Sequence, residues 1–380
     1  MLKQRGSVPN LVVAERVFNR MAAAAATHMS DETGEAMVGL VVPGVMSGGV
    51  PTLYVLDTIA PDDSAIRQFA TFQQGDARQD ELIWWLQENW RSERERKGGL
   101  FRKLANPNKW DVPLRYLGDW HKQPGHMIQP SGGDLNTALD WLLDADNEMD
   151  FLLAPIVTLG HPSTVQPSSP MANFVMVALD DGEAMRVDFW YIDQRTGLFQ
   201  PISPAIYPDD QLPALVQYPW HLINEKRMEA EMRLFQKEKL FHSISFWNVD
   251  NEAPLEICFL AGMMGSDHLL LLITDHDYPK QAPEVRVAPF LPMGAGDDMY
   301  KVFETAFKRS QPLALELEWS PSLYLVDVVH AAEAKLNPTS PNARKSKGES
   351  AAAIGDAAVS SPVSSTPTTP IIGDSEEKTP

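Results

Sequence analysis

The feature that most constrains the fold is a polar stretch, residues 118–134, which lies between an apolar run and a helical pattern. The apolar run, residues 113–117, is short and predicts a buried strand. Residues 134–143 begin with a carboxylate and carry leucines at helical spacing, which predicts a helix. The connecting loop contains five side chains that can form hydrogen bonds or ligate a metal, namely His121, Gln123, His126, Ser131 and Asp134.

The rest of the first half alternates between helical and strand patterns. Apolar residues at helical spacing predict helices over 14–27 and 77–97. β-rich runs at 37–42 and 52–59 are expected to pair across the Gly- and Pro-rich turn between them. Further strands are predicted at 151–158, 173–179 and 185–192. We therefore expect a mixed sheet flanked by helices, an α/β (α+β) fold.

Composition excludes several classes of protein. A net charge of −19 argues against nucleic acid or an anionic membrane as the main partner. The single cysteine, Cys258, excludes an internal disulfide framework and a cysteine-based zinc ribbon. The sequence shows no apolar run long enough for a bilayer and no secretory signal, so we expect a cytoplasmic protein.

The spacing within the polar stretch resembles the motif of JAB/MPN (JAMM) metalloproteases. In that family the run reads H-x-H-P and then S-x-x-D, and two histidines and one aspartate bind zinc. His121, Pro124, Ser131 and Asp134 fall on the family's positions, whereas Gln123 stands where the second histidine belongs. The resemblance implies that Ser131 hydrogen-bonds the oxyanion or the metal-bound water.

The glutamine decides what the motif can do. A catalytic zinc takes three protein ligands and one water, whose pKa falls to about 7. A neutral amide is a poor ligand for this ion, so Gln123 is expected to weaken zinc binding sharply unless His126 replaces it. The other interpretation is a decayed motif that holds a loop together through hydrogen bonds.

Residues 31–42 resemble the E-T-G-G-x-L-L-G segment of bacterial JAB proteins. Glu32, Thr33, Gly34 and Gly39 align, with Glu35 where a glycine is usual. The resemblance implies that Glu32 is the general base. Glu35 is the competing candidate, and we prefer Glu32 because of its spacing to Gly39. Alternatively, both are solvated carboxylates at the entrance of a strand.

The second half resembles the ubiquitin-conjugating (UBC) fold. A helix is predicted at 224–241, followed by strands at 244–249, 255–260 and 268–273 and a final helix at 323–336. Two segments carry the resemblance: Y-P-x-x-x-P-x-V-x-V, with Tyr278, Pro279, Pro283, Val285 and Val287, and W-S-P-S-L, with Trp319, Ser320, Pro321 and Leu323.

A conjugating enzyme carries its substrate on a cysteine thiolate. That residue is expected about eight positions before Trp319, where Gln311 stands, and no cysteine occurs between Pro289 and Trp319. Cys258 lies in the apolar run EICFL and is expected to be a buried, inert side chain. This half is therefore expected to recognise a partner rather than form a thioester.

These patterns predict three parts: a JAB/MPN-like domain at 1–222, an inactive UBC-like domain at 223–336 and a disordered tail at 337–380. The tail is rich in Pro, Ser, Thr, Ala and Lys and has few large apolar residues.

Two functions compete. The preferred one is a zinc-dependent isopeptidase or peptidase that acts on a ubiquitin-like protein or its conjugates, as in bacterial ubiquitin-like systems. In it, Zn²⁺ is held by His121 and Asp134 with Gln123 or His126. The alternative is a non-catalytic adaptor of such a system, supported by the loss of a residue central to chemistry in both halves. Either role allows an activating enzyme as a further partner.

Overall fold

The structure, a computed structural model, describes residues 8–69, 71–73, 77–97, 108–147, 149–162, 169, 171–179, 182–249, 253–262, 265–294 and 296–337. Two compact units divide between Leu215 and Val216, and each is described by itself. The tail predicted from residue 337 lies outside the described residues from 338 onward. Among the described helices, none is long and apolar enough to cross a membrane.

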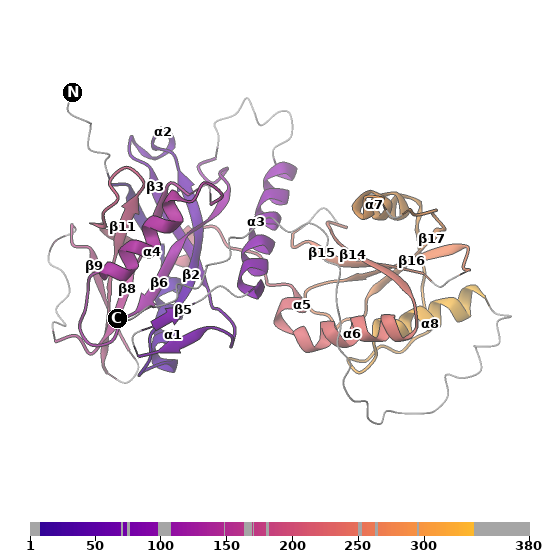
Figure 1. The fold of residues 1–380 in the computed structure, drawn as a ribbon. Helices are drawn as coiled ribbons and strands as arrows, with labels where there is room; N and C mark the ends of the chain where they lie inside the picture. The colour runs from indigo at the N-terminus through magenta and orange to yellow at the C-terminus, as the bar shows by residue number, and fades with distance from the viewer. Residues whose placement is uncertain are drawn as a thin grey trace, which may run out of the picture. The chain divides into compact units, whose positions relative to one another are not determined.

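The first unit is built on one large mixed sheet (Figure 1). Within the described residues its main path runs β12-β11-β7-β6-β2-β3-β1-β13, and β8, β9 and β10 extend it beside β6. The strands are β1 (Asn10–Ala14), β2 (Thr33–Val42), β3 (Thr52–Ile59), β6 (Leu114–Lys122), β7 (Phe151–Leu153), β8 (Ile156–Leu159), β9 (Phe174–Ala178), β10 (Ala184–Asp188), β11 (Trp190–Asp193), β12 (Gln200–Pro201) and β13 (Pro204–Tyr207). A separate hairpin pairs β4 (Ile66–Gln68) with β5 (Thr71–Gln73).

The centre of this sheet agrees with the sequence pattern. β2 and β3 are antiparallel, as expected from their β-rich runs and the turn between them. Both strands are buried almost throughout, and α1 packs against both of them. β6 pairs with β2 on its other side, and this pairing places His121 opposite Gly34. The predicted mixed α/β fold is confirmed.

Two helices flank β6 on opposite faces. Along β6, Lys122 donates to the backbone oxygens of His28 and Met29, just after α1 (Glu15–Thr27). The neighbouring His121 points instead to Asp134 in the first turn of α4 (Gly132–Leu143). Because side chains alternate along a strand, α1 and α4 lie on different sides of the sheet here. The other helical segments before Val216 are α2 (Gly44–Ser47), α3 (Ala77–Lys97) and η2 (Asp209–Gln211). The last residues of α3, from Ser92, are grouped with the second unit.

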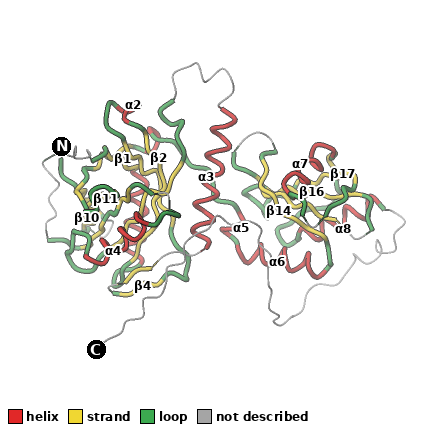
Figure 2. Tube along the Cα trace, turned by 45° about the horizontal axis from the view of Figure 1, so that its top comes forward, coloured by secondary structure: helices red, strands yellow, loops and turns green. Residues whose placement is uncertain are grey.

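The second unit is a five-stranded antiparallel meander between helices (Figure 2). Its elements are α5 (Trp220–Ile223), α6 (Glu225–Lys237), β14 (Phe241–Trp247), β15 (Glu256–Gly262), β16 (His268–Thr274), β17 (Glu284–Pro289), α7 (Met299–Arg309), β18 (Gln311–Pro312) and α8 (Leu325–Leu336). Alternate residues of β15 and β16 face α6 and α8 on one side and α7 on the other. α5 belongs to this unit, because Trp220 is part of its core.

Candidate functional site

The candidate site lies where β6 ends. The backbone N–H groups of His121 and Gln123 donate to the carbonyls of Pro155 and Val157, at 3.1 and 3.0 Å. These bonds continue the parallel pairing of β6 with β8 and keep the chain extended past the strand. Extended geometry puts His121 and Gln123 on the same face, toward α4.

The first turn of α4 lies opposite the side chains of His121 and Gln123. Ser131 is the N-cap of the helix, and its Oγ accepts from the backbone N–H of Asp134 at 3.2 Å. Asp134 returns the contact, because its Oδ2 accepts from the N–H of Ser131 at 2.6 Å. This capping box fixes the carboxylate at the helix N-terminus, where the helix dipole favours a negative charge.

The Gln123 carboxamide hydrogen-bonds both to His121 of β6 and to Asp134 of α4. Its Nε2 lies 3.1 Å from His121 Nε2 and 3.3 Å from Asp134 Oδ2, and it donates to both. The direct distance from His121 Nε2 to Asp134 Oδ1 is longer, at 3.7 Å. Gln123 is only 5% exposed, and its Oε1 has no hydrogen-bond partner among the described residues. One amide N–H₂ group therefore lies between the two side chains that the resemblance assigns to zinc.

Burial sets the charge of the histidine. It lowers the pKa of His121, and the negative charge of Asp134 only partly opposes this effect. A neutral imidazole has one nitrogen that accepts and one that donates. Since the Gln123 amide donates to Nε2, the proton of His121 belongs on Nδ1.

The two candidate bases lie in different surroundings. Burial and then the charge of Asp134 raise the pKa of Glu32, while Lys122 lowers it, so Glu32 belongs to the site cluster. Its N–H donates to Gln68 of the β4–β5 hairpin at 2.8 Å. Glu35 pairs in register with Trp120, one residue before His121, and therefore faces the α1 side.

The surroundings of Glu35 support this placement. Burial raises its pKa, and Thr58, Trp120 and Arg20 oppose the shift. Its Oε2 has no hydrogen-bond partner among the described residues. Glu32, rather than Glu35, is thus the carboxylate whose pKa responds to the charge of Asp134.

His126 lies away from this cluster. Its side chain is exposed, and its ring packs edge-to-face on His161, with the centroids 5.6 Å apart. The structure therefore brings His121, Gln123, Ser131 and Asp134 into contact, places Glu32 where the charge of Asp134 raises its pKa, and leaves His126 on the surface.

The chemistry of these side chains does not fit a catalytic zinc. In the part of the chain that the structure describes, no group of three His, Cys, Asp or Glu side chains is placed to hold a metal ion. One imidazole and one carboxylate remain, and the third corner is an amide that directs its N–H₂ group inward. A donor N–H cannot ligate a cation, and an amide oxygen in its place is a weak zinc ligand.

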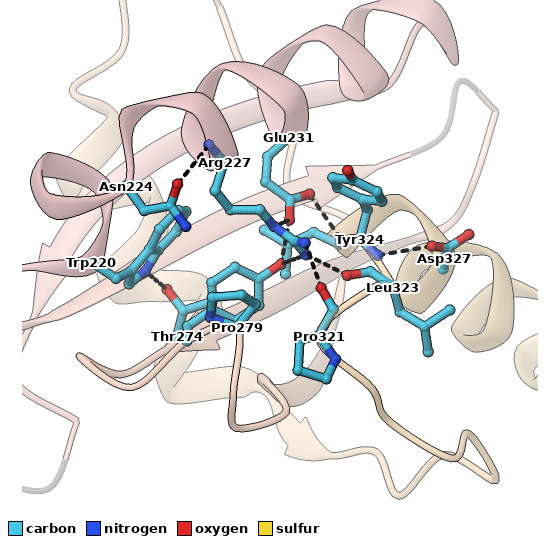
Figure 3. Close-up of polar contacts among 12 residues, drawn as sticks. Trp220, Asn224, Arg227, Glu231, Thr274, Pro279, Pro321, Leu323, Tyr324 and Asp327 are labelled. Carbon is cyan, nitrogen blue, oxygen red and sulfur yellow. Dashed lines mark hydrogen bonds and ion pairs between the residues drawn. The ribbon is translucent and has the colours of Figure 1, made fainter. Parts of the chain in front are cut away.

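In the second unit, the residues that carry the UBC resemblance build a buried network (Figure 3). Glu231 of α6 is fully buried and accepts from Arg227 Nε at 2.8 Å, from the Tyr278 hydroxyl and from the N–H of Leu325 at 2.8 Å. Arg227 also donates to the carbonyls of Pro321 and Leu323, and its guanidinium stacks on Tyr324. These contacts hold the segment before α8 in place, which is a structural role.

No accessible thiol accompanies this network. Cys258 is fully buried in β15, and burial raises the pKa of its thiol well above the usual value. Gln311 lies in the short edge strand β18 and is exposed. The expected burial of Cys258 is confirmed.

Comparison with known proteins adds little. No protein-family model and no curated protein matches the chain. A solution structure of a Desulfitobacterium hafniense protein is similar over 53% of this chain and 96% of that chain, at 14% identity and a TM-score of 0.26. A likeness this low supports no conclusion about fold or function.

Lys122 is a further part of the site's surroundings and was not predicted from the sequence. Its buried ammonium caps the carbonyls after α1 and lowers the pKa of Glu32. A lysine next to a motif histidine usually extends into solvent, so no sequence signal pointed to it.

Proposed function

We propose that this protein is a non-catalytic adaptor of a ubiquitin-like modification system and binds a ubiquitin-like protein or its conjugates. One observation carries the proposal: the Gln123 carboxamide bonds both His121 and Asp134. It satisfies these two groups without a cation and leaves no third ligand. The ubiquitin-related part of the proposal rests on the motif resemblances of both halves.

The second unit supports the same interpretation. A thioester needs an accessible thiolate, and Cys258 is buried and protonated at neutral pH. The position expected to hold the nucleophile carries Gln311. Among the described residues, one unit lacks a third zinc ligand and the other lacks an accessible thiol, so both are better suited to binding partner proteins than to catalysis.

A second candidate, a zinc-dependent isopeptidase or peptidase on the same class of partner, is favoured by Glu32. This carboxylate lies near Asp134 with a raised pKa, as a proton-transfer group needs. Gln123 argues against this candidate, for the reason given above.

Metal analysis separates the two functions. Wild-type protein, Gln123→His and His126→Ala are purified identically, saturated with zinc and dialysed, and the zinc per chain is measured. The adaptor predicts that wild type and His126→Ala retain much less than one zinc per chain. Gln123→His restores the missing imidazole and should retain about one.

The control is Gln123→His combined with His121→Ala, which should lose the zinc that Gln123→His gains. Stoichiometric zinc in the wild type contradicts the adaptor and supports the hydrolase. If His126→Ala removes that zinc, His126 is the replacement ligand.

A further inference from the structure

The segment after β18 has an open backbone edge. The N–H of Leu313 donates to Val285 of β17 at 2.8 Å and continues the antiparallel pairing of the two strands. β17 begins at Glu284, which lies opposite Ala314 in this register, so residues 315–319 extend beyond its end. The preceding Pro283 lacks an N–H and cannot prolong the ladder. Among the described residues, no backbone N–H from 315 to 319 has a hydrogen-bond partner.

The side chains keep this segment extended nevertheless. Leu313, Leu315, Leu317 and Trp319 are half-buried and pack on the core under α6 and α8. Between them, Ala314, Glu316 and Glu318 are exposed. Strict alternation is the pattern of a strand with one face on a core.

Both ends of the segment are also held. Trp319 Nε1 donates to the carbonyl of Pro279 at 2.9 Å, and Lys335 of α8 donates to the carbonyl of Ala314 at 2.6 Å. Arg227 holds the carbonyls of Pro321 and Leu323 just beyond it (Figure 3). The segment is thus held in place beyond the end of β18, and among the described residues no strand pairs with it, so an incoming strand need not order it.

The direction of the open groups follows from the ladder. In an antiparallel pair each residue directs its N–H and C=O to the same side, and successive residues alternate. Leu313 faces β17, so the backbone groups of Glu316 and Glu318 face away from it. Unpaired strand edges accept extended peptides through main-chain hydrogen bonds.

The charge of two exposed carboxylates indicates which kind of strand could bind to this edge. Glu316 and Glu318 are exposed, and no described cation pairs with either of them. Their carboxylates repel a second copy of the same edge and attract lysine or arginine on an incoming strand. The outward carbonyl of Ala314 is already taken by Lys335, so the open groups are those of residues 315–318. We propose that residues 315–318 bind an extended, basic segment of a partner protein by strand addition.

The test uses fluorescence anisotropy on the full chain with labelled nine-residue peptides. One peptide alternates lysine with threonine, a second alternates glutamate with threonine, and a third replaces the threonines of the first by proline. Wild type should bind only the lysine–threonine peptide, because the second repels the carboxylates and the third cannot form a ladder. Binding of the proline peptide equal to the first would overturn strand addition.

Substitutions locate the site. Glu316→Lys combined with Glu318→Lys should weaken the lysine–threonine peptide about tenfold and create binding of the glutamate–threonine peptide. Glu316→Pro removes an outward N–H and should weaken binding at least as much. Glu229→Lys, on the exposed face of α6, is the matched control and should leave affinity unchanged.

Besides equal binding of the proline peptide, three results would refute the proposal. The wild type could fail to bind the lysine–threonine peptide, or Glu229→Lys could weaken binding as much as the double charge reversal. The third result is binding only to a chain that ends after Asn337. In that case the occupant is the chain's own basic stretch, Arg344, Lys345 and Lys347, and not a partner.

Discussion

Replacing Gln123 by glutamate changes one donor into an acceptor with almost no change in shape. In Gln123→Glu, the N–H₂ group that lies 3.3 Å from Asp134 Oδ2 becomes a carboxylate oxygen. Two unit charges at that distance repel by about 5 kcal/mol at an effective dielectric constant of 20. The repulsion could be avoided by protonating the introduced carboxyl. At pH 8, however, protonating a group with an unfolded pKa of about 4.3 also costs about 5 kcal/mol. The side chains move apart to some extent, so we expect a loss of about 3 kcal/mol in unfolding free energy.

The destabilisation caused by Gln123→Glu should increase with pH. The introduced carboxyl has a pKa raised above its unfolded value, so the penalty is absent at low pH and grows as pH rises from about 4.3 to the folded pKa. Urea unfolding of the first unit, followed by hydrogen exchange of the β6 amides at pH 5 and pH 8, measures it. Gln129→Glu places the same charge on an exposed loop residue and should change stability by less than about 0.5 kcal/mol. Equal stability of the two variants at pH 8 would refute the bridging role of Gln123.

Three further predictions test the electrostatics and burial of both units. Glu231→Gln leaves the buried Arg227 without its counter-charge and should destabilise the second unit by about 3 kcal/mol in urea, whereas the exposed Glu229→Gln should have almost no effect. Cys258 should react with a thiol reagent only in denaturant, and labelling of the native protein at the rate of an exposed thiol would contradict its burial. Because the pKa of Glu32 is raised in the fold, its ionisation costs stability increasingly as pH rises above about 4.3. Glu32→Gln should therefore be more stable than wild type at pH 8, with a smaller difference at pH 5, and a pH-independent difference would contradict this.

Local patterns were sufficient to predict the frame around the site. The pairing of β2 with β3 follows from their β-rich sequences and the turn, and α4 begins at a Ser–Asp capping box. By contrast, no element was assigned to α7, although Val302, Phe303, Ala306 and Phe307 have helical spacing. This helix is short, and its apolar positions are flanked by charged residues.

The arrangement within the site depends on register, which spacing alone does not provide. Glu32 and Glu35 are three residues apart, and only the pairing of β2 with β6 places Glu35 opposite Trp120 on the α1 face. The contact of Gln123 with both His121 and Asp134 depends likewise on the backbone bonds to Pro155 and Val157, more than thirty residues away in the sequence. A single sequence shows the glutamine but not its partners.

The most direct test of the central claim is the state of the His121 ring. Long-range ¹H–¹⁵N spectra, with the His121 signals assigned by their loss in His121→Gln, report which nitrogen carries the proton. We predict a neutral ring protonated on Nδ1, with an Nε2 signal that does not change when one equivalent of zinc is added. A zinc-induced shift of the Nε2 signal to that of a metal-bound nitrogen would contradict the account.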